Sequence, residues 1–132
     1  MKRMVDPRRK GNRGEAEIEK WFREQGIEIM RTGYAQQRWG AVGSDLVIDQ
    51  PGFPRFDIEV KRTEVARLPS WRRQARRSAD RAGGIPRIYW RSSGQEWLSI
   101  GWLRDDLEWA RTLTGLSGLP SLRGDPPTGG SP

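Results

Sequence analysis

The stretch that decides the fold reads Phe56-Asp57-Ile58-Glu59-Val60-Lys61-Arg62. Apolar and charged residues alternate along it, and a period of two is typical of a β-strand that has one face in the core. The apolar side chains would point to one face of the sheet. Glu59 and Lys61 would stand side by side on the other face, two residues apart.

A second short strand is predicted at 45–49, and a turn containing proline and glycine separates it from the first. The chain reads Asp45-(x)13-Glu59-x-Lys61. A hairpin formed by the two strands can place Asp45 beside Glu59. Two carboxylates bind a hard divalent cation, and a neighbouring ammonium can orient or deprotonate an attacking water. This set of groups predicts metal-assisted cleavage of a phosphodiester.

The composition excludes several other chemistries. The chain of 132 residues contains neither cysteine nor histidine, so disulfides, cysteine–zinc sites, iron–sulfur clusters and serine–histidine triads are excluded. The length predicts one domain. Because no apolar run is long enough to cross a bilayer, and no apolar signal region follows the basic N-terminus, we expect an intracellular, cytoplasmic protein without a membrane association.

The positive charge is unevenly distributed. The formal net charge is +7, and arginine outnumbers lysine twenty to four. Residues 62–87 hold eight arginines against two acidic residues, whereas residues 92–132 hold three arginines against five acidic residues. A positive central segment favours binding to a polyanion such as nucleic acid. The alternative is an ordinary solvated surface in a protein from an arginine-rich, high-GC genome.

The remaining segments predict a small mixed sheet flanked by helices, in the order α-β-β-β-α-β-β-α. We expect a basic flexible arm at 1–10, a folded domain at 11–114 and a disordered Gly/Pro/Ser-rich tail at 115–132. Within the domain, helices are predicted at 11–25, 71–82 and 103–113, and further strands at 27–31, 85–90 and 95–100. Ser70 is the predicted N-cap of the second helix. The polar loop 32–44 carries Arg38 and Trp39 and leads into Asp45.

Glu15 lies at the edge of the apolar stripe of the first helix, which contains Ile18, Trp21 and Phe22. A carboxylate at the border of a buried face is costly without a partner. One interpretation makes Glu15 a third acidic member of the metal site. The other is a carboxylate near the helix N-terminus that is favoured by the helix dipole.

The second predicted helix carries four arginines within six residues: Arg72, Arg73, Arg76 and Arg77. They are candidates for gripping DNA phosphates, because so many like charges repel one another without a nearby anion. The alternative is the solvated side of an amphipathic helix. Gln74 lies among them and is placed to reach the active site.

These residues resemble a known superfamily. The pattern Asp45…Glu59-x-Lys61 with an upstream helical glutamate is similar to that of the PD-(D/E)xK nucleases, with Ser44 in place of the proline. More specifically, three stretches resemble archaeal-type Holliday junction resolvases: Arg9-Lys10-Gly11-Asn12-Arg13-Gly14-Glu15, Ile58-Glu59-Val60-Lys61 and Gly83-Gly84-Ile85-Pro86. The resemblance runs from about Arg9 to Trp97. The sequence leaves a phage or a cellular origin open.

The resemblance implies a restriction-endonuclease-like α/β fold and a homodimer that cuts branched DNA at four-way junctions, without a nucleotide cofactor. Each site would use Mg²⁺, for which Mn²⁺ would substitute. Glu15, Asp45 and Glu59 would be the acidic ligands, with the carbonyl of Val60 as a further ligand. Lys61 would be the catalytic lysine.

The candidate DNA contacts are basic residues near the N-terminus, two residues of the loop 32–44, the last residue of the strand 56–62 and polar residues of the second predicted helix. They are Arg9, Lys10, Arg13, Arg38, Ser44, Arg62, Arg72, Arg73, Gln74, Arg76 and Arg77. Two alternatives stay open. One is a nuclease of the same superfamily that acts on flaps, single strands or restriction-type sites. The other is a basic nucleic-acid-binding module in which the acidic cluster is structural.

Overall fold

The computed structural model describes residues 7–32 and 44–114. Its elements are α1 (Pro7–Glu24), β1 (Met30–Arg31), β2 (Leu46–Ile48), β3 (Phe56–Arg62), α3 (Leu68–Ala82), β4 (Ile85–Arg91), β5 (Leu98–Ile100) and α4 (Leu103–Thr114). Their order agrees with the predicted one. The described helices include none that is both long and apolar enough to cross a membrane.

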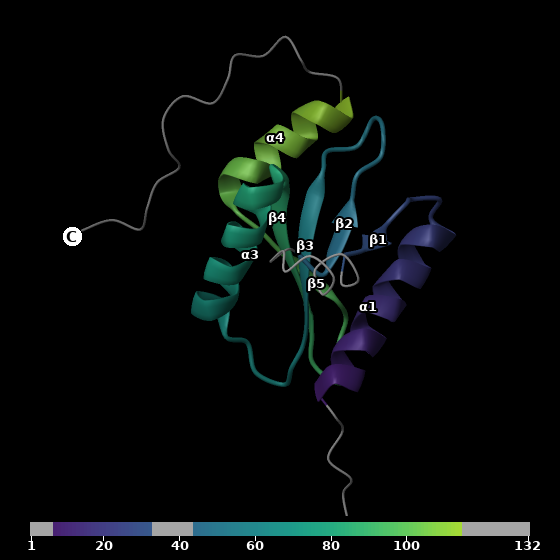
Figure 1. The fold of residues 1–132 in the computed structure, drawn as a ribbon, viewed down its shortest axis with the longest axis vertical. Coiled ribbons are helices and arrows are strands. Elements are labelled where there is room, and N and C mark those ends of the chain that lie inside the picture. The colour runs from purple at the N-terminus through teal and green to yellow at the C-terminus, as the bar shows by residue number, and fades with distance from the viewer. Residues whose placement is uncertain (1–6, 33–43, 115–132) are drawn as a thin grey trace, which may run out of the picture.

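The strands form one mixed sheet in the order β1-β2-β3-β4-β5, with β3 in the centre (Figure 1). Within the described residues, β3 and β4 are the parallel pair, and α3 connects them. The other neighbours are antiparallel. The register pairs Leu46 of β2 with Ile58 of β3, which brings the start of β2 beside the centre of β3.

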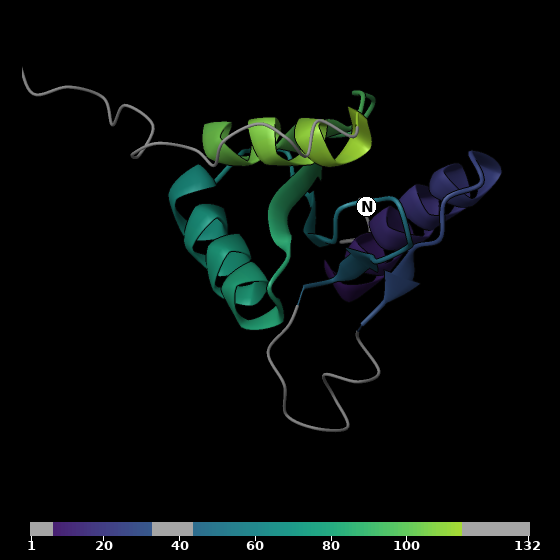
Figure 2. The ribbon, with the colours of Figure 1, turned by 90° about the horizontal axis from the view of Figure 1, so that it is seen from above.

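Helices α1 and α3 lie on opposite sides of the sheet (Figure 2). On the α1 side, Ile18 packs in one core cluster with Ile58 and Val60. On the other side, Trp71 of α3 packs in a second cluster with Ile88 of β4. The alternation predicted along β3 is therefore present, and the charged side of the strand faces α3.

Two helices begin earlier than predicted. Helix α1 starts at Pro7, so residues 7–10 of the expected arm are helical. A proline suits the first turn because its missing N–H would have no helical partner there. Helix α3 starts at Leu68 with Arg67 as its N-cap, and the Ser70 hydroxyl donates to the Arg67 carbonyl at 3.1 Å instead of capping. The expected tail at 115–132, like residues 1–6, lies outside the described residues.

The two consecutive glycines after α3 have separate structural reasons. Gly83 ends the helix with a φ of 77° and donates its N–H to the Ala79 carbonyl at 2.7 Å, the left-handed ending that glycine favours. At Gly84 a Cβ atom would overlap the Asp57 carboxylate. This part of the resolvase-like motif therefore lets the chain turn and then pass directly against β3.

The prediction that Trp21 lies in the core is wrong, since its side chain is 57% exposed. Gly14 and Ile18 form the inward side of α1 instead. A Cβ atom on Gly14 would lie 3.2 Å from the side chains of Val60, Arg62 and Trp97. Helix α1 thus packs tightly onto β3 at the level of Glu15.

Candidate active site

Backbone pairing at the start of β2 fixes Asp45. Its N–H donates to the Ile58 carbonyl at 2.9 Å, and its Oδ2 accepts a hydrogen bond from the Val60 N–H at 2.8 Å. The carboxylate is therefore held against β3 at the position of Glu59 and Val60. This is the neighbourhood that the predicted hairpin requires.

Glu59 is a buried carboxylate with one satisfied oxygen. The residue is 1% exposed, and its Oε1 accepts a hydrogen bond from the Ser78 hydroxyl at 3.1 Å. Its Oε2 is buried and has no hydrogen-bond partner among the described residues. Burial, followed by the negative charge of Asp45, raises the pKa of Glu59 to about 8.

The Asp45 and Glu59 carboxylates therefore lie close enough to influence each other's charge. If Glu59 is protonated it can donate a hydrogen bond to Asp45, an interaction that also raises its pKa. If both groups are ionised, the charge of Asp45 repels that of the buried Glu59 carboxylate. A proton or a cation at this position would relieve the repulsion, and two carboxylates are a donor set that fits a divalent metal ion.

Glu15 approaches Asp45 from the side of α1. Burial and then the charge of Asp45 raise its pKa to about 7, while Arg31 lowers it. The Arg31 Nε lies 3.9 Å from Glu15 Oε2, and the same guanidinium pairs with Glu19. Asp45 thus interacts both with Glu15 on α1 and with Glu59 on β3.

The three predicted acidic ligands are not gathered around one point. Within residues 7–32 and 44–114, no group of three acidic side chains is arranged to hold a metal ion. The charge of Asp45 and a hydrogen bond with its side chain both raise the pKa of Glu59, so Asp45 and Glu59 form the close pair. Glu15 is linked to that pair through Asp45.

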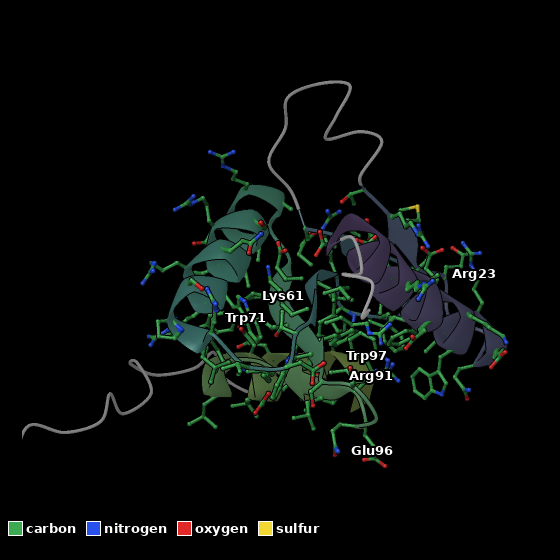
Figure 3. All side chains as sticks on the ribbon, turned by 90° about the horizontal axis from the view of Figure 1, so that it is seen from below. Arg23, Lys61, Trp71, Arg91, Glu96 and Trp97 are labelled. Atoms are coloured by element: carbon green, nitrogen blue, oxygen red, sulfur yellow. The ribbon has the colours of Figure 1, made fainter. Side chains whose placement is uncertain are left out.

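Lys61 lies between α1 and α3 (Figure 3). Its Nζ donates to Gln74 Oε1 at 2.7 Å. Gln74 therefore contacts Lys61, and α3 holds the ammonium group through this bond, while the roles of both residues in the active site stay predictions. The positive charge of Lys61 also opposes the upward shift in the pKa of Glu59.

Ser44 has a different environment from the one predicted. It is 2% exposed, and its hydroxyl donates to Asp57 Oδ1 at 3.0 Å. Arg55 Nε lies 3.3 Å from the other oxygen of Asp57. The Ser44 hydroxyl is therefore directed into the protein rather than presented to DNA, and the contact anchors the chain immediately before Asp45.

The four arginines of α3 are exposed, as a phosphate-binding surface requires. Arg76 also pairs with Asp80 at 3.3 Å and lies 5.8 Å from the ring centre of Trp102. Arg13 on α1 is exposed too. For Arg9 and Lys10 the structure describes only the helical backbone, and Arg38 lies outside the described residues. The DNA contacts of all these basic residues, exposed or not described, stay predictions.

Arg62 is engaged within the protein instead of being freely exposed. Its Nη1 lies 3.4 Å from Glu17 Oε1, and Glu17 Oε2 accepts a hydrogen bond from Trp97 Nε1 at 3.1 Å. Arg91 contacts the same glutamate at 3.5 Å and lies beside Trp97 (Figure 3). This cluster fastens α1 to the sheet and engages the Arg62 guanidinium within the protein. The predicted DNA contact of Arg62 stays a prediction.

Sequence reasoning missed three polar residues around the site: Ser78, Arg31 and Asp57. Ser78 is four residues after Gln74, so its helical spacing could have placed it against β3. Asp57 shares the charged face of β3 with Glu59, although nothing in its spacing indicated a bond to Ser44. Nothing in the sequence around Arg31 indicated a place near the site, because its pairing with Glu15 depends on how α1 packs beside β1.

The sheet and this site together define a class of protein. A mixed sheet that carries two neighbouring carboxylates and a lysine on adjacent strands has a restriction-endonuclease-like fold. Residues 6–114 match the family model described as archaeal Holliday junction resolvase (Hjc). The chain belongs to this family. It is therefore a Holliday junction resolvase, a nuclease that acts on branched DNA and, as the family implies, requires a divalent metal ion.

A solved structure supports the fold independently. The Holliday junction resolvase Hjc of the archaeal hyperthermophile Archaeoglobus fulgidus matches with a TM-score of 0.53 and 19% sequence identity. The match covers 70% of this chain and 72% of the other. No curated protein matches the sequence significantly.

Proposed function

We propose that the chain is a Mg²⁺-dependent endodeoxyribonuclease that resolves four-way junctions by paired symmetric nicks. Asp45 and Glu59 would hold the metal ion, with the Val60 carbonyl as a further ligand. Glu15 would complete the site through a water molecule or at a second metal ion. The observation that carries this proposal is the buried, unpartnered Oε2 of Glu59 in electrostatic contact with Asp45.

Magnesium is the metal that fits this donor set best. Both side-chain ligands are carboxylates, and the described residues offer oxygen donors rather than sulfur or imidazole, because the chain has no cysteine or histidine. Mg²⁺ prefers oxygen ligands and usually retains several waters, which suits a site with two direct carboxylates. Mn²⁺ should substitute, because it accepts similar ligands.

The chain's own groups have distinct roles in the proposed reaction. When bound, Mg²⁺ would lower the pKa of a coordinated water and offset charge on the phosphate. Lys61 would orient the attacking water or stabilise the additional negative charge in the transition state. Gln74 would keep the Lys61 ammonium in place through their 2.7 Å hydrogen bond. The exposed arginines of α3 would bind the phosphates of a junction arm.

A homodimer would supply the two active sites that paired nicks require. Support comes from α4, where Leu103 and Leu107 lie four residues apart and are both exposed, Leu103 at 67%. Together these two neighbouring side chains form an exposed apolar surface that a second copy of the chain could cover. The protein would act as an intracellular, DNA-associated enzyme that needs no nucleotide cofactor.

Substitution of Lys61 by alanine tests the proposed chemistry. We expect junction cleavage to be abolished while junction binding remains measurable, because the ammonium group acts on the reaction and contributes little to total phosphate binding. Single-turnover cleavage and a gel-shift assay in Ca²⁺ would measure the two properties. Lys20→Ala is the control, since Lys20 is an exposed lysine on α1. Near-wild-type cutting by Lys61→Ala would contradict the assignment.

A further inference from the structure

Helix α3 contacts the charged face of β3 at two points. Gln74 and Ser78 lie four residues apart on the helix, and they bind Lys61 at 2.7 Å and Glu59 at 3.1 Å. Four helical residues advance about 6 Å, and two strand residues advance about 6.6 Å. Because these repeats nearly match, one helix can hold both functional side chains of the strand.

The contact at Ser78 determines which oxygen of Glu59 remains available. Both residues are 1% exposed, so no bulk water competes for the hydrogen bond. The terminal torsion of a glutamate is broad and readily turns the carboxylate plane. With Oε1 bound to the Ser78 hydroxyl, the carboxylate plane is restrained and Oε2 alone is left without a partner.

Ser78 also has small neighbours on the buried side of α3. Ala75 and Ala79 are both buried, and they allow the helix to lie close to the sheet. An alanine at position 78 would serve close packing equally well. The hydroxyl is therefore needed for its hydrogen bond and not for its size.

We propose that Ser78 is a positioning residue for metal binding, which holds Glu59 so that Oε2 is presented together with the Asp45 carboxylate. The inference rests on the proposed function, because it requires Glu59 to be a metal ligand. Ser78 itself would touch neither the metal ion nor the DNA. Its effect would pass through the orientation of Glu59 alone.

Calorimetric titration with Mn²⁺ in the absence of DNA tests this role. We expect Ser78→Ala to weaken Mn²⁺ binding by about ten- to a hundredfold, the usual effect of losing a partner that orients a metal ligand. Ser70→Ala is the matched control, since it removes an exposed hydroxyl from the same helix. Ser78→Thr retains the hydroxyl and should recover part of the affinity, with the recovery limited by its additional methyl group in a closely packed position. At saturating Mg²⁺, the cleavage rate of Ser78→Ala should return close to that of the wild type.

A double-variant cycle makes the test specific. In the Glu59→Gln background, adding Ser78→Ala should cause no further loss of Mn²⁺ affinity, because the group that Ser78 positions is no longer a ligand. Equal Mn²⁺ affinity of Ser78→Ala and wild type, or additive losses in the cycle, would overturn the positioning role while leaving the metal site intact. Wild-type Mn²⁺ affinity of Glu59→Gln alone would instead overturn the proposed function.

Discussion

Replacement of Glu59 by glutamine is expected to abolish junction cleavage and, at the same time, to stabilise the metal-free protein at alkaline pH. Cleavage should fall by about a thousandfold or more, because a neutral amide removes the charge that the metal ion requires. The opposite effect on stability follows from the buried position of the carboxylate and from its repulsion by Asp45.

The sign of the stability change is set by the pKa of Glu59. The value is raised from 4.5 to about 8 in the folded protein, so the folded state binds the proton more tightly than the unfolded chain between these pH values. Stability therefore falls as pH rises from about 5 to about 8. Glutamine cannot ionise, and at pH 8.5 it should raise the free energy of unfolding by roughly 2–4 kcal/mol.

Urea unfolding in EDTA at several pH values between 5 and 8.5 would measure this effect. The wild type should lose stability with rising pH, and the free energy of unfolding of Glu59→Gln should fall less steeply with pH. Some dependence on pH should remain in this variant, because the pKa of Glu15 is also raised, to about 7. Glu24→Gln replaces an exposed glutamate of α1 and should retain the wild-type slope. Addition of Mg²⁺ should stabilise the wild type at pH 8 but not Glu59→Gln. A glutamine variant no more stable than the wild type at pH 8.5 would contradict this account.

The second large effect is expected from the arginines of α3. Replacing Arg72, Arg73, Arg76 and Arg77 by alanine should weaken junction binding by roughly a hundred- to a thousandfold at 0.1 M salt, and reduce the slope of log K against log salt by up to about four. All four side chains are exposed on one helix. Arg76 should contribute least, since it already pairs with Asp80.

Fluorescence anisotropy with a labelled junction in Ca²⁺, at salt concentrations from 50 to 300 mM, would give both quantities. A charge-matched comparison uses Arg72→Ala/Arg73→Ala against Lys20→Ala/Arg23→Ala, a pair on the exposed side of α1. The α1 pair should leave the salt slope nearly unchanged. If the quadruple variant kept the wild-type slope, the arginines would be an ordinary solvated surface.

The sequence alone was sufficient to predict the features of the fold that are determined by a local pattern of residues. The strand at 56–62 has the predicted bounds because alternation of apolar and charged residues specifies both its period and its buried face. Its pairing with the strand after Asp45 also followed from the short intervening turn. The proximity of the Asp45 and Glu59 side chains could be predicted for this reason.

Features that depend on packing between distant segments could not be predicted. The orientation of α1 exposes Trp21, because Gly14 allows the helix to approach β3 on another side. Ser44 is directed toward Asp57, and Ser78 toward Glu59, through hydrogen bonds that join different elements. The position of Glu15 relative to Asp45 likewise depends on the closeness of the α1–β3 contact.

The most direct test of the central claim compares a four-way junction with a linear duplex of the same sequence, with and without Mg²⁺. We expect the junction to be cut only in the presence of Mg²⁺, by paired nicks placed symmetrically across it, while the duplex stays intact. Equal cutting of junction and duplex would indicate a nuclease with another substrate. Binding of the junction without any Mg²⁺-dependent cutting would contradict the proposed active site.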